Sequence, residues 1–559
     1  MASAPEPWQA SAIAYSNDFD GLQGALSGWD SFGKSLTRVR PRTPPWHWAL
    51  ALLAGLAQAA SLALPGSGAP QWWLQLAALA ALAWLVRPSS THHPITWRRA
   101  AGLGWLFATA WLAGTFWWLF ISMHTYGGLA APLAAAAVLG LAAFLALYYA
   151  AALGLFSALA LTHRALAALI FAALWLLAEL ARGLWWTGFP WGASGYAHVE
   201  GPLAALARSV GVYGICAIAA ALAMLLAQSR ASDLRNRRAW ALLAAVVAAL
   251  GVLSWQRERA IAAPHPPASA PLTLALLQGN IPQDEKFQPG SGVPLALRWY
   301  AEQLHSAQAQ LVVAPETAIP LLPQQLMPGY LEAIAQRYTQ GGQAALVGMP
   351  LGDLEQGYTN SVQGWRPGQS APYRYDKHHL VPFGEFIPPL FRWFTELMNI
   401  PLGDFHRGSL RQTPFVWRGE RIAPNICYED LFGEELGARF ADPAQAPTVF
   451  VNLSNIGWFG DSVAIDQHLS ISRMRALEFE RPMVRATNTG ATAIIDHRGV
   501  VTHQLARATR GVLTGQVQGR SGAITPYAAW VSRFGLWPLW IFGAGVVLAA
   551  WGLRRQGRH

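Results

Sequence analysis

The segment LTLALLQGN at residues 272–280 is a short apolar run that ends in a glycine turn. Apolar runs of four to eight residues, several of them separated by helical patterns, are typical of a buried sheet covered by helices. Further runs of this kind lie at 311–315, 344–350, 421–429, 448–454, 483–490 and 492–499, with helical patterns at 324–339 and 464–480. The sequence therefore predicts an α/β domain, which we place at residues 257–533.

The rest of the chain has a membrane-like composition. Of the 559 residues, 53% are hydrophobic and only 13% are charged, about half the usual ~25% for soluble domains. Most of the apolar stretches approach the ~20 residues that a helix needs to cross a bilayer. The eight stretches are roughly 46–64, 71–86, 101–122, 128–161, 165–182, 203–228, 239–255 and 536–553. We therefore predict a tail at 1–45, seven spans within 46–256, and an eighth span and second tail within 534–559.

The net charge of +10 indicates topology rather than a nucleic-acid surface. Residues 257–533 contain 23 basic and 23 acidic side chains, so the whole excess belongs to the apolar part. Its basic residues cluster after alternate stretches, whereas the short loops 65–70 and 123–127 have none. Basic loops stay in the cytoplasm. This predicts cytoplasmic N and C termini and an α/β domain on the outer side.

Two features of the apolar part have alternative interpretations. The loop 183–202 is rich in Trp and Tyr, which is typical of an interfacial belt but also suits a lipid-binding floor under the outer domain. Glu179 lies near the outer end of the fifth stretch, where an ionisable residue is a functional candidate. Arg182, three residues later on the same helix, offers a structural partner instead. The 34-residue stretch 128–161 is interpreted as one long or tilted helix.

Three polar residues near the predicted strand ends form a candidate site. Glu316 follows a strand, Lys377 is one of only three lysines, and Cys427 precedes Tyr428, Glu429 and Asp430. Taken singly, they could be a loop carboxylate, a surface lysine and a buried apolar thiol. Together they suit acyl transfer through a thioester: the carboxylate as general base, the thiol as nucleophile and the ammonium opposite a tetrahedral oxyanion.

Longer motifs resemble a known family. Glu, Lys and Cys in this order at strand ends resemble the nitrilase superfamily, and the match is closest to the apolipoprotein N-acyltransferase family. The resemblance covers residues 46–555. Its motifs are TGFPW at 187–191, QGNI at 278–281, PET at 315–317, YTNS at 358–361, YDKHHLVPFGEFIP at 375–388, ICYED at 426–430, SNIGWFGDS at 454–462 and QHLSISRMRALEFERPMVRATNTG at 467–490.

The resemblance implies an α-β-β-α sandwich joined to eight spans, and a role for each matching residue. Glu316 would be the base, Lys377 the stabiliser of the transition state and Cys427 the nucleophile. Glu385 would position Lys377 and assist proton transfer, and the Tyr428 amide would complete the oxyanion hole. The remaining support residues would be Tyr428 and Glu429 in the wall of the site and, as a weaker match, Asn360.

The resemblance also implies the substrates and the location. A phospholipid, most simply phosphatidylethanolamine, would donate an acyl chain to the α-amino group of an S-diacylglyceryl-cysteine apolipoprotein. The site would face the periplasm from the bacterial inner membrane. The sequence indicates no metal site and no cofactor, and a monomer is the simplest assembly.

The segment 387–405 and the overall function each leave alternatives. This segment is an ordinary amphipathic core helix or a mobile apolar lid over the site. Its candidate lid residues are Phe391, Trp393, Phe394, Leu397 and Met398. The outer domain could instead be a membrane-tethered amidase that delivers water to the thioester. A transporter with a regulatory outer domain would need more charge in its spans than Glu179 and Arg208 supply.

Overall fold

The computed structural model describes residues 44–88, 95–159, 161–237, 270–369, 371–387 and 405–556, and isolated positions between 241 and 259. The chain separates into two compact units, Met1–Pro45 and Trp46–His559. Everything that follows concerns the second unit, which contains the candidate site.

The first of two six-stranded sheets begins with the predicted strand at residue 272. Alternate side chains of this strand face opposite cores, with Leu274 and Leu276 on one side and Ala275 and Leu277 on the other. Its three central strands, β1 to β3, are parallel and the outer strands are antiparallel. The order is β12 (Gly511–Val517), β1 (Leu272–Gln278), β2 (Leu311–Ala314), β3 (Ala344–Asp353), β4 (Gly357–Trp365) and β5 (Tyr373–Asp376).

The second sheet repeats this plan. Three parallel strands, β7 to β9, form its centre, and antiparallel strands flank them. The order is β11 (Val501–Gln504), β10 (Ala493–Ile495), β9 (Met483–Thr487), β8 (Val449–Ser454), β7 (Glu420–Ile426) and β6 (Phe415–Trp417). All seven predicted strands are therefore present, whereas β4, β5, β6, β11 and β12 were not predicted.

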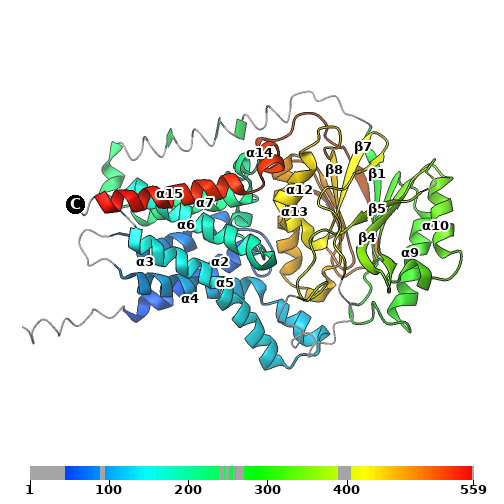
Figure 1. The fold of residues 1–559 in the computed structure, drawn as a ribbon, viewed down its shortest axis with the longest axis horizontal. Helices are drawn as coiled ribbons and strands as arrows, with labels where there is room; N and C mark the ends of the chain where they lie inside the picture. The colour runs from blue at the N-terminus through cyan, green and yellow to red at the C-terminus, as the bar shows by residue number, and fades with distance from the viewer. Residues whose placement is uncertain are drawn as a thin grey trace, which may run out of the picture. The chain divides into compact units, whose positions relative to one another are not determined.

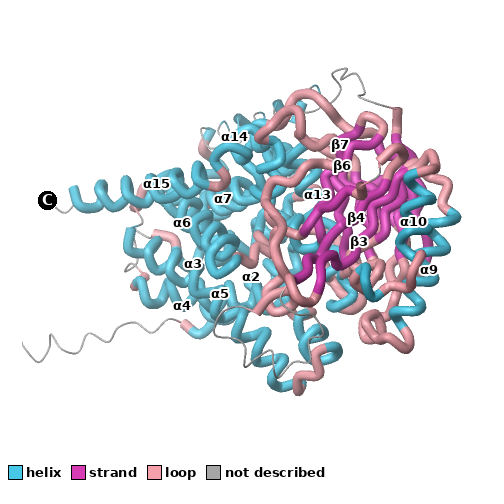
Figure 2. The backbone as a smooth tube through the Cα atoms, turned by 45° about the vertical axis from the view of Figure 1, so that its right-hand side comes forward, coloured by secondary structure: helices cyan, strands magenta, loops and turns pink. Residues whose placement is uncertain are grey.

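The two sheets form the inner layers of a four-layer sandwich (Figures 1 and 2). One apolar core lies between the sheets and joins Leu276 of β1 to Val451 of β8. A second core lies between the first sheet and helices α9 (Gly292–Ser306) and α10 (Tyr330–Thr339). The other face of the second sheet packs against α13 (Ala464–Phe479), with α12 (Gly433–Gly437) and α14 (Pro526–Phe534) beside it. The predicted α-β-β-α architecture is confirmed.

The apolar part is a bundle of helices. Seven of the eight predicted stretches are helical, and most of the residues of stretch 239–255 lie outside the described ones. Among the described residues, four helical segments are long and apolar enough to cross a membrane: 131–159, 164–187, 202–227 and 537–556. The helices are α2 (Pro45–Leu62), α3 (Trp72–Val86), α4 (Trp97–Phe116), α5 (Ala131–Leu159), α6 (Arg164–Leu184), α7 (Ala207–Ala227) and α15 (Trp537–Gln556).

Two expectations for this bundle are met. The stretch 128–161 contains a single 29-residue helix, α5. Glu179 and Arg182 form a fully buried ion pair of 2.7 Å, and Arg182 also donates to Tyr149 at 3.0 Å. Because the Glu179 carboxylate also accepts a bond from Ser194 at 2.8 Å, its contacts are those of a structural residue.

The aromatic loop 183–202 divides into two parts. Trp185 and Trp186 are 55% and 82% exposed, as an interfacial belt requires. Trp191 is instead buried, and its indole N–H donates to Gln467 of α13 at 2.8 Å. Trp118 of the bundle donates to the same Gln467 oxygen at 3.0 Å. The later part of the loop is therefore a packed joint between the bundle and the sandwich.

Candidate active site

Cys427 lies directly after β7, in a turn that holds the backbone in an unusual conformation. Its φ is +51°, in the left-handed region that residues other than glycine rarely adopt. Two donors hold its carbonyl oxygen, the Asn452 amide and His468 Nε2, each at 3.2 Å. The side chain remains partly exposed. Such strain persists only where the surroundings fix it and is common at active sites.

Glu316 follows β2 at the corresponding end of the first sheet. Its carboxylate is bound from three different segments: Asn360 Nδ2 donates to Oε1 at 2.7 Å, Lys377 Nζ lies 3.3 Å from the same oxygen, and the Asn455 backbone N–H donates to Oε2 at 2.8 Å. Gly348 on β3 makes room for this segment, because a Cβ there would lie 2.7 Å from the Glu316 Cα. Both sheets therefore position the carboxylate.

Lys377 follows β5 and lies between two carboxylates. Its fully buried ammonium is 2.9 Å from Glu385 in addition to its contact with Glu316. Asn360, on the neighbouring β4, donates to both carboxylates, and its distance to Glu385 Oε1 is 2.6 Å. The Val381 N–H fixes the second Glu385 oxygen at 2.8 Å. Four of the residues singled out from the sequence thus form one hydrogen-bonded cluster.

The pKa values of the titratable groups in this cluster shift in different directions. Burial favours a neutral Glu316, but Lys377, Asn360 and other donors outweigh it and hold the pKa of Glu316 below its usual range. For Glu385, burial together with the neighbouring Glu316 raises the pKa despite Lys377. Burial alone would lower the pKa of Lys377, yet the two carboxylates raise it above the ordinary value. The cluster therefore contains an ionised carboxylate and a permanent ammonium.

The thiol needs a base. Burial and the charge on Glu316 raise the pKa of Cys427 to about 12, although Lys377 and Ser454 oppose the shift. A thiol with this pKa reacts as a nucleophile only if its proton is removed during attack. Glu316 is the ionised base in this cluster, and Lys377 is the adjacent cation. The arrangement can therefore perform nucleophilic acyl transfer with base assistance.

Glu429 holds the two sides of the site together. It accepts hydrogen bonds from the Tyr375 hydroxyl at 2.8 Å, the His378 N–H at 2.7 Å and the Ile426 N–H at 2.6 Å. These donors belong to the segments that carry Lys377 and Cys427. Glu429 therefore links β5 to β7 just beside the reacting groups.

Tyr428 connects the same turn to the helix bundle. Its hydroxyl donates to the carbonyl of Gly188 at 3.1 Å, and its ring stacks on Phe189 at a centroid distance of 6.3 Å. Tyr428 and Glu429 therefore both contact segments that surround Cys427, and their role in the wall of the site stays a prediction.

Known proteins resemble the chain along most of its length. The model of the apolipoprotein N-acyltransferase N-terminal domain matches residues 50–225, and that of carbon-nitrogen hydrolase matches residues 273–525. The apolipoprotein N-acyltransferase of Verminephrobacter eiseniae is 68% identical over 502 residues, which cover 88% of this chain and 94% of the relative. This chain belongs to the apolipoprotein N-acyltransferase family. The family member of Ralstonia nicotianae is 46% identical and covers 87% of this chain, and 90% of that relative is matched.

Among solved structures, a carbon-nitrogen hydrolase from Helicobacter pylori matches 49% of this chain. The match covers 94% of the hydrolase, with 15% identity and a TM-score of 0.33.

Two residues that contact Glu316 were not predicted as site residues from the sequence. Lys286, in the turn between β1 and α9, donates from Nζ to the backbone carbonyl of Glu316 at 3.1 Å. Asn455, after β8, supplies the N–H that binds Glu316. The rarity of lysine, which drew attention to Lys377, applies equally to Lys286. Asn455 lies in the family motif SNIGWFGDS at 454–462, but its contact with Glu316 arises only when the two sheets pack, and the motif did not indicate it.

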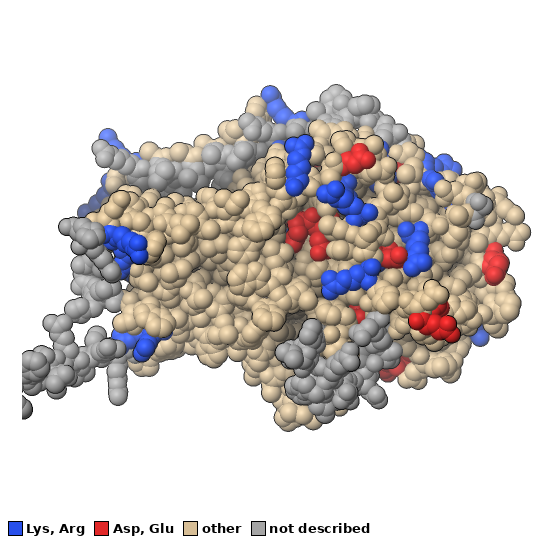
Figure 3. Space-filling model, in the orientation of Figure 1, with Lys and Arg blue, Asp and Glu red and all other residues tan. Residues whose placement is uncertain are grey.

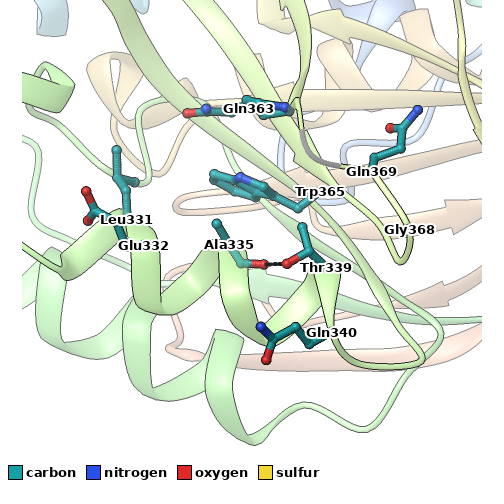
Figure 4. A pocket seen from close by; sticks show the side chains of 10 residues that line it. Leu331, Glu332, Ala335, Thr339, Gln340, Gln363, Trp365, Gly368 and Gln369 are labelled. Carbon is teal, nitrogen blue, oxygen red and sulfur yellow. Dashed lines mark hydrogen bonds between the residues drawn. The ribbon is translucent and has the colours of Figure 1, made fainter.

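A surface hollow shares no residue with this cluster, and the candidate lid residues lie outside the described residues. The candidate lid residues Phe391, Trp393, Phe394, Leu397 and Met398 lie outside the described residues, so the lid stays a prediction. A hollow of about 440 Å³ lies between α10 and β4, lined by Leu331, Ala335 and Trp365 (Figure 4). It shares no residue with the cluster and contains no thiol or lysine.

Proposed function

We propose that the chain is an apolipoprotein N-acyltransferase with a Glu316–Lys377–Cys427 triad. It transfers a fatty acyl chain from a membrane phospholipid to the N-terminal α-amino group of S-diacylglyceryl-cysteine apolipoproteins. The observation that carries the proposal is the buried Glu316–Lys377–Glu385 cluster beside Cys427, in a chain 68% identical to a protein of that name. The proposed acyl donor is phosphatidylethanolamine.

In the first half-reaction, Cys427 attacks the sn-1 ester of the phospholipid. Glu316 takes the thiol proton as the C–S bond forms, and Lys377 and the Tyr428 N–H stabilise the oxyanion. When the C–O bond breaks, Glu316 returns the proton to the leaving oxygen of the lysophospholipid. The enzyme keeps the acyl chain as a thioester on Cys427.

In the second half-reaction, the α-amino group of the apolipoprotein attacks the thioester. Glu316 accepts a proton from the amine, the C–S bond breaks, and the proton passes to the departing thiolate of Cys427. The product is an N-acylated apolipoprotein, and the free thiol is restored. Glu385 acts through Lys377, which it holds at 2.9 Å, and assists proton transfer.

The proposed location follows from the charges and the apolar helices. We propose eight spans with cytoplasmic termini, in a bacterial inner membrane, and place the domain 257–533 in the periplasm. On the face shown in Figure 3, a surface with few charges over the helix bundle separates basic residues at one end from mixed charges over the sheets. Basic residues at one end of a bundle are retained in the cytoplasm. We further propose that the protein acts as a monomer.

The test is to trap the intermediate. Full-length protein in detergent micelles is incubated with phosphatidylethanolamine labelled in its sn-1 chain, quenched in acid and analysed for a hydroxylamine-sensitive label on Cys427. We expect the label in the wild type and in Cys216→Ser, the matched control at the other cysteine, and none in Cys427→Ser. Addition of a diacylglyceryl peptide should discharge the label as amide. A wild type without label that cleaves small amides would be an amidase instead.

A further inference from the structure

Lys286 is a buried lysine to which the mechanism above gives no role. Its side chain is 1% exposed, and its ammonium donates a hydrogen bond to the Glu316 carbonyl. Its own N–H donates to the Pro282 carbonyl at 2.9 Å, which fixes the turn that carries it. Removing an ammonium from water costs several kcal/mol, so an apolar side chain would be the simpler way to fill this space. A buried lysine here therefore calls for a reason other than packing.

The surroundings of Lys286 are those of the reacting groups. Glu316 and Cys427 are the two titratable residues whose charges act on it, and both favour its ammonium form. In return, the charge of Lys286 is one of the influences that keep Glu316 ionised. Lys286 thus holds the backbone of the base, while Lys377 contacts its carboxylate at 3.3 Å.

We propose that Lys286 is a second active-site lysine, a positioning residue that anchors Glu316 by its backbone carbonyl and adds a positive charge beside Glu316 and Cys427. The inference rests on the proposed function, in which Glu316 is the base and Cys427 the nucleophile. Four segments then hold the base: Lys286 binds its carbonyl, the Asn455 N–H binds one carboxylate oxygen, and Lys377 and Asn360 bind the other.

The charge of Lys286 is more variable than that of Lys377. Burial lowers the pKa of Lys286 to about 7, against the opposing influence of Glu316 and Cys427. Loss of its positive charge makes both the Glu316 carboxylate and the Cys427 thiolate less favourable, because a nearby cation stabilises each anion. Lys286 carries this charge below about pH 7, so its removal must move the titration of Glu316 to higher pH, whereas Cys427 titrates where Lys286 is already neutral.

The experiment compares pH profiles of the full-length protein. The variants are Lys286→Met, which loses donor and charge, Lys286→Gln, which keeps a donor, and Lys286→Arg, which keeps both. The matched control is Arg510→Met, because Arg510 also donates to a backbone carbonyl, that of Gly279 at 2.7 Å, from an exposed position. Two rates are measured from about pH 3 to 8, the range in which Glu316 ionises while Lys286 is charged: acyl-thioester formation from labelled phosphatidylethanolamine, and alkylation of Cys427 by iodoacetamide, read by mass spectrometry.

We expect Lys286→Met and Lys286→Gln to move the acid limbs of both rates, which follow the ionisation of Glu316, up by about one pH unit, and so to slow thioester formation about tenfold on that limb. Lys286→Arg should restore the wild-type limbs, and Arg510→Met should leave them in place. Rates that fall equally at every pH, with unshifted limbs, would reduce Lys286 to a structural residue and overturn the proposal. If Lys286→Met does not fold, the Gln variant decides. A shifted alkylation limb in a protein that forms no thioester would support Lys286 and reject the acyltransferase function.

Discussion

Two buried clusters of charge lie on either side of the same turn, and they differ in how their charges are matched. Around Asp430, one carboxylate is paired with Arg485 at 3.1 Å and with His468 at 2.9 Å, and Ser472 also donates to it. Around Cys427, three residues away, two carboxylates share one ammonium, and a thiol and a second lysine lie within electrostatic reach.

Under the proposed function, this difference separates a structural cluster from a reactive one. Burial raises the proton affinity of Asp430, but His468, Arg485 and Ser472 outweigh it, so its pKa lies below the usual value. Burial lowers the pKa of His468, which leaves a neutral ring that can donate from Nε2 and accept from Arg485 at Nδ1. Each group there has one stable protonation state. In the Cys427 cluster the pKa values of Glu316 and Glu385 move in opposite directions, which is how a site keeps one base ready.

The largest effect is expected from Lys377→Met. It removes the shared ammonium, so the two buried carboxylates repel each other and the oxyanion loses its cation. We expect thioester formation to fall about 10³-fold. Rates of label incorporation on quenched samples measure this. Lys377→Arg is the control for charge, and we expect it to fail as well, because a planar guanidinium does not replace a compact ammonium between two carboxylates. Near-normal rates in both variants would contradict a reactive role for this cluster.

Asp430→Asn should show the opposite pattern. It leaves Arg485 buried without its anion, which costs about 3–5 kcal/mol of stability. Thermal unfolding in detergent measures the loss, and the activity of the remaining folded enzyme should stay within about tenfold of the wild type.

The decrease in the free energy of unfolding at low pH gives a second test of Asp430. Because its native pKa is depressed, its contribution is present above the ordinary carboxyl pKa of about 3.9 and disappears as pH falls through the lower native value. The Asn variant should lack this part of the acid dependence. A 10³-fold loss of activity at unchanged stability would mean that Asp430 takes part in the reaction. The two clusters would then not differ in role.

Glu429→Gln should affect both properties, because Glu429 joins the segments of the two reacting groups. The amide keeps one acceptor oxygen and directs N–H groups at donors such as Tyr375 and the His378 N–H. Misplacement of Lys377 relative to Cys427 by about 1 Å costs on the order of 10²-fold in rate, and stability should fall by about 1–3 kcal/mol. Kinetics and unfolding are measured on the same samples. A pure stability loss would make Glu429 equivalent to Asp430.

The cluster of Glu316 and Lys377 was easier to predict from the sequence than the contacts that hold it in place. Glu316 and Cys427 lie at the ends of predicted strands and Lys377 is a rare lysine, so these three could be singled out from the residues. Glu385 and Asn360 were predicted only through the resemblance, which also supplied the roles. The contact of Asn455 with Glu316 could not be predicted, although Asn455 lies in the family motif at 454–462, since pairing across the sandwich leaves no local pattern.

The fold was predictable to a similar degree, and its misses also have a physical reason. The buried parallel strands are continuous apolar runs and were found. Strand β4, with the sequence GYTNSVQGW, is rich in polar residues, and the edge strand β11 is largely exposed. Their pairing depends on neighbours rather than on their own hydrophobicity.

The smallest effect is expected from Tyr428→Phe, which separates the roles of the backbone and the side chain of one residue. In the proposed mechanism the Tyr428 N–H binds the oxyanion, and this group is unchanged in Phe. The hydroxyl serves instead to bind Gly188 of the helix bundle, at 3.1 Å. Its loss should cost about 1 kcal/mol of stability and less than tenfold in thioester formation. Tyr375→Phe, which loses a hydroxyl bound to Glu429, is the matched control. If Tyr428→Phe instead abolished thioester formation without lowering the unfolding temperature, the Tyr428 hydroxyl would itself take part in the reaction. Tyr428 would then belong with the reacting residues and not with those that only support the fold.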